Sequence, residues 1–268
     1  MNIYEYISDK DNEKPLDRIV TDGGFCGIFR SVGCIGDSLS SGEFESLNKD
    51  GSKCYHDFYD YSWGQYLGRD CGSKVYNFSR GGMTAELFIN QFAEECGVWS
   101  QDKICQAYII ALGVNDIINQ KKELGTVADI CKDDCEKNMP TFAGYYAKII
   151  QKIKKLQPRA KIFLMTIPRE GTDSDCDRKR VRDLLEELTQ FFNRTYLIDL
   201  YSYAPIYDEQ FRSKFFLGHM TATGYVLTAK MVESYIDYII RKNPEDFNQV
   251  GFIGTNLYYQ SEDNYYEK

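Results

Sequence analysis

The sequence predicts a protein of the α/β class, in which three layers form an α/β/α sandwich around a five-stranded parallel sheet. Two observations predict this class. Short apolar runs alternate five times with longer amphipathic segments, which is the pattern of a doubly wound sheet. One run, Ala107–Leu112, is uninterrupted by charge, and this suits a strand that is buried on both faces of a parallel sheet.

The order of the elements follows from these patterns. Strands are predicted at Cys26–Ile35, Val75–Phe78, Ala107–Leu112, Lys161–Ile167 and Tyr196–Leu200. Apolar residues that recur every three or four positions predict the helices. One begins at Trp63, and the others cover Thr84–Cys96, Phe142–Leu156, Arg178–Phe192 and Tyr225–Ile239. Right-handed crossovers would place these helices on both faces, which gives a flavodoxin-like sandwich whose ligands bind beyond the carboxyl ends of the strands.

The chain of 268 residues is predicted to hold one such domain, over residues 26–243. The polar residues 1–25 are expected to form an arm that packs on the domain surface, and residues 244–268 a tail. Residues 42–61 are rich in Tyr, Asp, Lys and Gly, and are expected to form a long loop over the site. The sequence leaves open whether this loop acts as a lid.

The charge of the chain limits its partners. The 32 basic and 40 acidic residues give a formal net charge of −8 and a pI near 5.0. A nucleic-acid-binding protein needs a basic face, so neither nucleic acid nor an anionic membrane surface is an expected partner. We expect a small-molecule substrate, and the sequence does not predict the oligomeric state.

The cysteines and the N-terminal residues indicate a compartment. Nine cysteines are scattered without the spacing of a disulfide framework, and Met1–Tyr6 lacks the basic and apolar parts of a signal peptide. We therefore expect a cytoplasmic protein with reduced thiols. Cys131 and Cys135 lack the clustered partners of a zinc site, so no metal is predicted.

Four short motifs carry the residues that could perform chemistry. They are Gly36-Asp37-Ser38-Leu39-Ser40, Asn77-Phe78-Ser79-Arg80-Gly81-Gly82-Met83-Thr84, Gly113-Val114-Asn115-Asp116 and Gly218-His219-Met220-Thr221. The first three fall at the ends of predicted strands, so they would meet at one edge of the sheet. In this order and spacing the motifs resemble the four blocks of the SGNH (GDSL) hydrolase family, whose members cleave esters with a serine nucleophile. The resemblance covers about residues 29–240 and implies an acyl-serine intermediate without any cofactor.

Ser38 and His219 are the predicted catalytic pair. Ser38 lies in a turn that enters a helix, where its hydroxyl is exposed and backbone N–H groups can face an oxyanion. The alternative is that Ser38 merely caps that helix, and Asp37 is expected to orient the turn. A serine hydroxyl needs a base, which is usually a histidine. The other histidine, His56, lies in the 42–61 segment, which leaves His219 as the predicted base.

The resemblance also implies an oxyanion hole. Its donors would be the backbone N–H groups of Ser38 and Gly82 and the side-chain amide of Asn115. A glycine permits close approach of a substrate to the backbone, although Gly81 would serve sterically as well. A carboxamide is a neutral donor, and its alternative role at Asn115 is to stabilise a turn. Asp116 is expected to brace the loop.

One part of the family pattern is missing. The family carries an acid three residues before the histidine, and here that residue is Phe216. Three explanations are open. In the first, which we favour, the backbone carbonyl of Phe216 or of a neighbour accepts the His219 N–H. In the second, an acid such as Asp208 or Glu209 approaches from elsewhere. In the third, turnover is weak or absent. Loss of a triad acid can cost about four orders of magnitude in rate.

The segment 42–61 and its neighbour are unusually aromatic. The side chains concerned are Tyr55, Phe58, Tyr59, Tyr61 and Trp63. Aromatic rings beside polar groups can stack on sugars or line an acyl groove, although exposed tyrosines are common. We hypothesise that Tyr59 and Trp63 contribute to substrate selection.

Together these residues predict a serine esterase that hydrolyses small acyl esters, above all acetyl esters of carbohydrates. The alternatives are a degenerate member of the family that binds a ligand with little turnover, and a lysophospholipase or thioesterase. A nucleotide-binding protein is disfavoured, because Gly36-Asp37-Ser38 lacks the G-x-G-x-x-G and Walker patterns.

Overall fold

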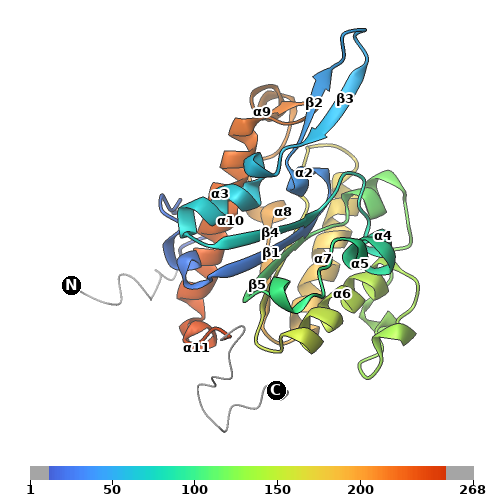
Figure 1. Ribbon diagram of the computed structural model, residues 1–268, viewed down its shortest axis with the longest axis vertical. Coiled ribbons are helices and arrows are strands. Elements are labelled where there is room, and N and C mark those ends of the chain that lie inside the picture. The colour runs from blue at the N-terminus through green and yellow to red at the C-terminus, as the bar shows by residue number, and fades with distance from the viewer. Residues whose placement is uncertain (1–11, 252–268) are drawn as a thin grey trace, which may run out of the picture.

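The computed structural model describes residues 12–251 and confirms the predicted sandwich (Figure 1). Five parallel strands form one sheet in the order β4-β1-β5-β6-β7. Their bounds are β1 Ser31–Gly36, β4 Lys74–Ser79, β5 Ala107–Ala111, β6 Lys161–Met165 and β7 Thr195–Ile198. The chain reverses its direction of winding at β1, which has β4 on one side and β5 on the other. This switch point is where sheets of this kind bind ligands.

Helices cover both faces of the sheet. On one face lie α4 (Ala85–Leu87), the π-helical turn η3 (Phe88–Phe92), α5 (Ala93–Glu95), α6 (Phe142–Leu156) and α7 (Asp175–Phe191). On the other lie α3 (Trp63–Cys71) and α10 (Ala222–Lys242). Side chains of β1 alternate between the two cores, since Val32 and Cys34 pack with α10 while Ile35 packs with α6. Both faces are therefore apolar, as the sequence predicts.

The remaining elements are short. They are η1 Gly24–Ile28, α2 Ser38–Ser41, η2 Tyr59–Tyr61, η4 Gln101–Lys103, η5 Val114–Asn119, η6 Val127–Asp129, η7 Cys135–Lys137, α8 Leu200–Tyr203, α9 Glu209–Phe215, β8 Phe216–Leu217, β9 His219–Met220 and α11 Pro244–Phe247. The first strand begins later than predicted, because Gly23 and Gly24 adopt left-handed backbone angles and the chain from Gly24 to Ile28 makes a 3₁₀ turn. Helix α7 begins three residues earlier than predicted, at Asp175.

Residues 42–61 are not the predicted long loop. They form an antiparallel hairpin of β2 (Glu43–Leu47) and β3 (Lys53–Asp57), which extends away from the rest of the molecule (Figure 1). Most side chains of β3 are exposed, and those of β2 are partly buried only over its first three residues, so the hairpin lacks the apolar alternation by which a half-buried strand is identified. A turn signal is present, because Asp50-Gly51 lies between the two strands.

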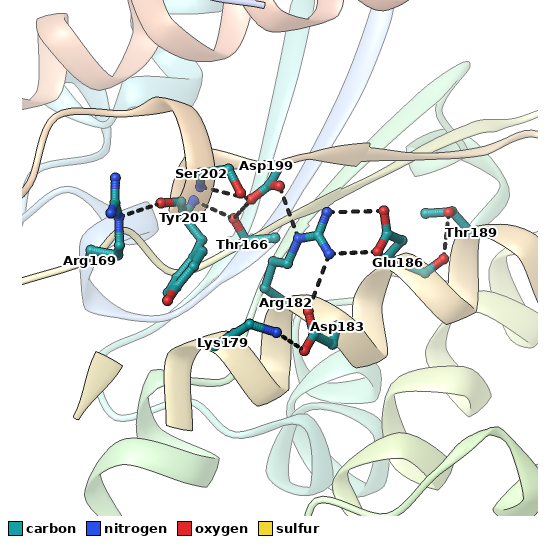
Figure 2. Close-up of polar contacts among 10 residues, drawn as sticks. All are labelled: Thr166, Arg169, Lys179, Arg182, Asp183, Glu186, Thr189, Asp199, Tyr201 and Ser202. Carbon is teal, nitrogen blue, oxygen red and sulfur yellow. Dashed lines mark hydrogen bonds and ion pairs between the residues drawn. The ribbon is translucent and has the colours of Figure 1, made fainter. Parts of the chain in front are cut away.

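A polar network fixes the far edge of the sheet to α7 (Figure 2). The buried Asp199, which follows β7, accepts hydrogen bonds at Oδ1 from Thr166 Oγ1 at 3.3 Å and from the Ser202 N–H at 3.1 Å. Its Oδ2 accepts one from Arg182 Nε at 3.0 Å, and the other two nitrogens of Arg182 bind both carboxylate oxygens of Glu186. This network gives both carboxylate oxygens of Asp199 a partner.

The described part of the predicted arm contacts α10. The Val20 N–H donates to Ser234 Oγ at 3.0 Å, and Glu13 pairs with Arg241. The rest of the arm, residues 1–11, and the tail beyond residue 251 lie outside the described residues. Within residues 12–251 all nine cysteines are free thiols, and no helix combines the length and apolar character needed to cross a membrane.

Candidate active site

Ser38 lies at the carboxyl end of β1, at the switch point of the sheet. It is the first residue of α2, and Asp37 caps this helix by accepting a hydrogen bond from the Leu39 N–H at 3.0 Å. Asp37 therefore orients the turn, as the sequence suggests. Burial raises the pKa of the Asp37 carboxyl to about 7. Across the described residues, neither the Ser38 hydroxyl nor the Ser38 N–H has a hydrogen-bond partner, so both are free to meet a ligand.

Gly82 and Asn115 come from the ends of the strands on either side of β1. Gly82 follows β4 with φ +71°, and a Cβ added there would meet only open space. Asn115 follows β5, and its Nδ2 donates to the Met83 carbonyl at 3.1 Å and, at the longer distance of 3.4 Å, to Asp37 Oδ2. The amide of Asn115 is thus held beside the turn that carries Ser38. In the longer contact a substrate oxygen could replace Asp37 Oδ2 as the acceptor of the Asn115 N–H.

Asp116 braces this loop. Its Oδ1 accepts a hydrogen bond from the Ala85 N–H at 2.9 Å, which ties the end of β5 to the first turn of α4. Burial raises the pKa of the Asp116 carboxyl to about 6, and its Oδ2 is buried without a partner among residues 12–251. The loop after β4, which contains Gly82, and the loop after β5 are therefore held together by this hydrogen bond.

His219 lies on β9, which packs against α2. Its Nε2 is 3.0 Å from Glu43 Oε1, and the edge of its ring meets Tyr55 with the ring centroids 5.4 Å apart. Its Nδ1 is buried and has no hydrogen-bond partner in the described chain. No hydrogen bond joins His219 to Ser38 among these residues, although catalytic hydrogen bonds are often long before a substrate binds.

The favoured replacement for the missing acid is not present. The Phe216 carbonyl accepts no hydrogen bond from His219, because β8 and β9 form a tight antiparallel pair in which the backbone of Phe216 faces Met220. The remote acids do not approach either. Asp208 caps α9 by accepting from the Phe211 N–H at 2.9 Å, and Glu209 is exposed on that helix. The acid beside His219 is instead Glu43.

Sequence reasoning missed Glu43, which lies five residues after Ser38 in the stretch assigned to a loop. Burial raises the pKa of the Glu43 carboxyl above its usual range, while the nearby His219 acts in the opposite direction. The Asp50-Gly51 turn signal could have predicted the hairpin. Nothing local could have predicted its contact with β9, because Glu43 and His219 are 176 positions apart in the sequence.

Comparison with known proteins agrees with this geometry. The model of the GDSL-like lipase/acylhydrolase family matches residues 34–227, which is most of the chain. The chain belongs to this family. A search of curated proteins found no match to the chain.

Solved structures share the fold at low sequence identity. A Lactobacillus plantarum protein is 16% identical with a TM-score of 0.57, over 78% of this chain and 97% of that one. A family two carbohydrate esterase from Clostridium thermocellum, in complex with cellohexaose, is 15% identical with a TM-score of 0.54, over 81% of this chain and 65% of that one. A putative lipolytic protein of the G-D-S-L family from Desulfitobacterium hafniense is 18% identical with a TM-score of 0.50, over 77% and 99%.

An apolar cavity lies beside the GDSL motif. It has a volume of about 100 Å³, and its walls include Asp37 and Leu39, which flank Ser38, and Phe216 and Met220, which lie near His219. Arg178 reaches the same cavity from α7, where it pairs with Glu170 at 2.8 Å. Neither Ser38 nor His219 is among the described residues that line this cavity, so it adjoins the Ser38 turn through the neighbouring residues.

The aromatic hypothesis needs a correction at Trp63. This side chain is only 1% exposed and donates from Nε1 to Ser40 Oγ at 3.2 Å, so it is part of the core beneath the GDSL motif. A ligand outside the protein cannot stack on it. Tyr55, Phe58 and Tyr59, in contrast, are each about half exposed on the hairpin and the turn that follows it. The hypothesis therefore remains open for these three residues and for Tyr61, which is 47% exposed.

Proposed function

We propose that the chain is a serine esterase that hydrolyses small acyl esters, above all acetyl esters, on carbohydrates. The observation that carries this proposal is the convergence of Ser38, Gly82 and Asn115 from three adjacent strand ends, with His219 on the neighbouring β9. The Ser38 and Gly82 N–H groups are unoccupied in the described chain and the Asn115 amide lies beside them. Donors held in place before the reaction are what an oxyanion hole requires.

The proposed reaction uses these groups in two steps. His219 takes the proton of Ser38 Oγ while that oxygen bonds to the acyl carbon, and the carbonyl electron pair becomes an oxyanion held by the three donors. The oxyanion then collapses, the bond to the alcohol oxygen breaks, and imidazolium returns the proton to that oxygen. Water repeats the sequence on the acyl-serine and releases the acid. No metal or organic cofactor takes part in this proposal.

Two features support the substrate class. A cavity of about 100 Å³, lined by the neighbours of Ser38, Asp37 and Leu39, has a size that suits a short acyl chain. Half-exposed aromatic side chains on the adjacent hairpin, Tyr55 among them, offer flat surfaces against which a sugar ring can pack. Carbohydrate esterases are among the structures that share this fold, at identities that carry no argument beyond the fold.

The test compares wild type with Ser38→Ala at pH 8 on p-nitrophenyl acetate and p-nitrophenyl butyrate. We expect the wild type to prefer acetate and the variant to lose at least about 10³-fold in rate. Acetylated xylan and a lysophospholipid then serve as competing natural substrate classes. Release of acetate from xylan alone supports the proposal, whereas release of fatty acid favours the lysophospholipase alternative. No activity in either protein would favour a ligand-binding member of the family, and equal activity in both would show that Ser38 is not the nucleophile.

A further inference from the structure

We infer that Glu43, the first residue of β2, is the acid that positions His219, in place of the missing acid three residues before the histidine. This inference rests on the proposed esterase function and names a further residue of the same site. Glu43 is a positioning residue in this account, because it acts on the substrate through the imidazole.

The first argument is the pattern of contacts on the two nitrogens of the imidazole. Glu43 Oε1 lies 3.0 Å from His219 Nε2, and both side chains are largely shielded from water, with 16% and 23% of their surfaces exposed. A carboxylate at this nitrogen holds its proton there and so selects the tautomer. The other nitrogen, Nδ1, then keeps a free lone pair, and it is buried without a partner in the part of the chain that the structure describes. One nitrogen held by an acid and one left free is the arrangement of a general base.

The second argument is that the backbone of Glu43 is fixed. Gly42 ends α2 with φ +81°, and a Cβ there would lie 2.6 Å from the Phe58 carbonyl oxygen, so the turn into β2 requires glycine. The Tyr225 hydroxyl, from α10, donates to the Glu43 carbonyl at 2.7 Å. The Phe44 ring packs on Tyr225 with the centroids 5.4 Å apart. Gly42, which follows the Ser38 motif, and α10, which follows the His219 motif, therefore both fix the first residues of β2.

The third argument is that the site makes room for the carboxylate. A Cβ added to Gly81 would lie 2.5 Å from Glu43 Oε2, so glycine at this position leaves space for the acid. Glycine at 82 leaves space on the substrate side instead. On the hairpin, Glu43 lies opposite Asp57, whose carboxylate accepts a hydrogen bond from Ser41 Oγ. The two neighbouring glycines therefore have different roles.

The proton path follows from this geometry. Glu43 keeps the proton of His219 on Nε2, and Nδ1 receives the proton of Ser38 Oγ as the new bond to the acyl carbon forms. The imidazolium is then stabilised by the Glu43 carboxylate, which stays ionised throughout. The same proton leaves Nδ1 for the oxygen of the departing alcohol. A movement of the Ser38 or His219 side chain must first bring Oγ and Nδ1 into hydrogen-bonding distance.

The experiment compares Glu43→Gln with the matched control Glu45→Gln. Glu45 lies two residues further along β2 and pairs with Lys53 at 2.8 Å, so its variant removes an equal charge close to the site and leaves the carboxylate beside His219 Nε2 in place. We expect Glu43→Gln to lower kcat about a hundredfold or more, with KM within about threefold of wild type. We expect Glu45→Gln to change both constants by less than about threefold. The rate of Ser38 labelling by a fluorophosphonate should follow kcat.

A second readout is independent of turnover. The chain has two histidines, so nitrogen NMR resolves the tautomer of each, and the exposed His56 is the internal reference. We expect His219 of the wild type at high pH to carry its proton on Nε2, and Glu43→Gln to change this state while His56 stays the same. A proton on Nδ1 in the wild type would overturn the inference, as would an unchanged His219 signal in the variant.

The two proposals fail in different ways. A Glu43→Gln variant as active as the wild type overturns the role of Glu43, and a variant more active than wild type shows that Glu43 competes with Ser38 for the imidazole. A wild type that Ser38→Ala matches in turnover and in labelling contradicts the esterase function instead. In that case the tautomer still decides whether Glu43 holds His219.

Discussion

The pairs Asp199–Arg182 and Glu43–His219 each join an acidic to a basic side chain, and they differ in whether any polar side-chain atom is left without a hydrogen-bond partner. Asp199 and Arg182, at the edge of the sheet, are saturated, because each carboxylate oxygen and each guanidinium nitrogen has a partner (Figure 2). Glu43 and His219, beside the switch point, leave His219 Nδ1 buried and unpaired in the described residues. Buried polar groups in proteins are generally satisfied, so an exception needs an explanation. Here the explanation is that Nδ1 is kept free to receive the proton of Ser38 Oγ during the proposed reaction.

His219→Ala should have the largest effect on activity and little effect on stability. Without a base, kcat on p-nitrophenyl acetate should fall by at least about 10³-fold. The midpoint of thermal unfolding should stay close to that of the wild type, because the side chain is partly exposed and pairs with a single residue. His56→Ala is the control and should retain wild-type rates. A His219→Ala protein with wild-type kcat would remove this residue from the mechanism.

Asp199→Asn should show the opposite profile. Loss of the charge leaves Arg182 without its buried partner, and we expect the free energy of unfolding to fall by about 3 kcal/mol, with kcat within about threefold of wild type. Asp183→Asn removes a more exposed partner of the same arginine and should cost less than about 1 kcal/mol. Denaturant unfolding measures both. Equal losses in the two variants would show that burial of Asp199 has no special value.

Asn115→Ala tests the oxyanion hole. The loss of one donor to the developing charge should lower kcat by about 10²- to 10³-fold, or roughly 3 kcal/mol, with little change in KM. Asn119→Ala is the matched control, because Asn119 donates to Asn115 Oδ1 at 3.0 Å and faces no substrate in this account. A rise in KM without a fall in kcat would mean that Asn115 binds the ground state and not the transition state.

Asp37→Asn should change the pH dependence of stability. Folding raises the pKa of Asp37 from 3.8 to about 7, so its contribution to stability is fully present below pH 3.8 and is lost as the pH rises towards 7. The asparagine does not titrate, so the stability of the variant relative to wild type should increase between pH 5 and pH 7, by on the order of 2 kcal/mol. Denaturant unfolding at both pH values measures this. A constant difference would show that Asp37 is already ionised at pH 5.

The smallest effects are expected at the remote acids. Asp208→Asn and Glu209→Gln should leave kcat within about threefold of wild type, because Asp208 caps α9 and Glu209 is exposed. Asp208→Asn retains a capping side chain, so stability should change by less than about 1 kcal/mol. A hundredfold loss of kcat in either variant would identify a different acid for His219 and so contradict the role of Glu43.

The sequence predicts the fold and the placement of Ser38, Gly82 and Asn115 at strand ends well, because both depend on local patterns. Five apolar runs define the sheet, and Ser38, Gly82 and Asn115 each follow one of its strands closely. The acid beside His219 is different, since it depends on how a polar hairpin pairs with itself and then meets β9. Trp63 shows the same limit. It begins a helix, as predicted, but its burial depends on the tertiary contact with Ser40. The cytoplasmic location and the absence of nucleic-acid and membrane partners stay predictions.

The most direct test of the account is to treat the wild type and Ser38→Ala with a fluorophosphonate and to locate the adduct by peptide mass spectrometry. The account predicts one adduct in the wild type, on the peptide that contains Ser38, and none in the variant. Labelling should also slow when His219 is replaced by alanine, because the same base activates the hydroxyl. An adduct on another residue, or an unlabelled wild type, would contradict the assignment of Ser38 as the nucleophile.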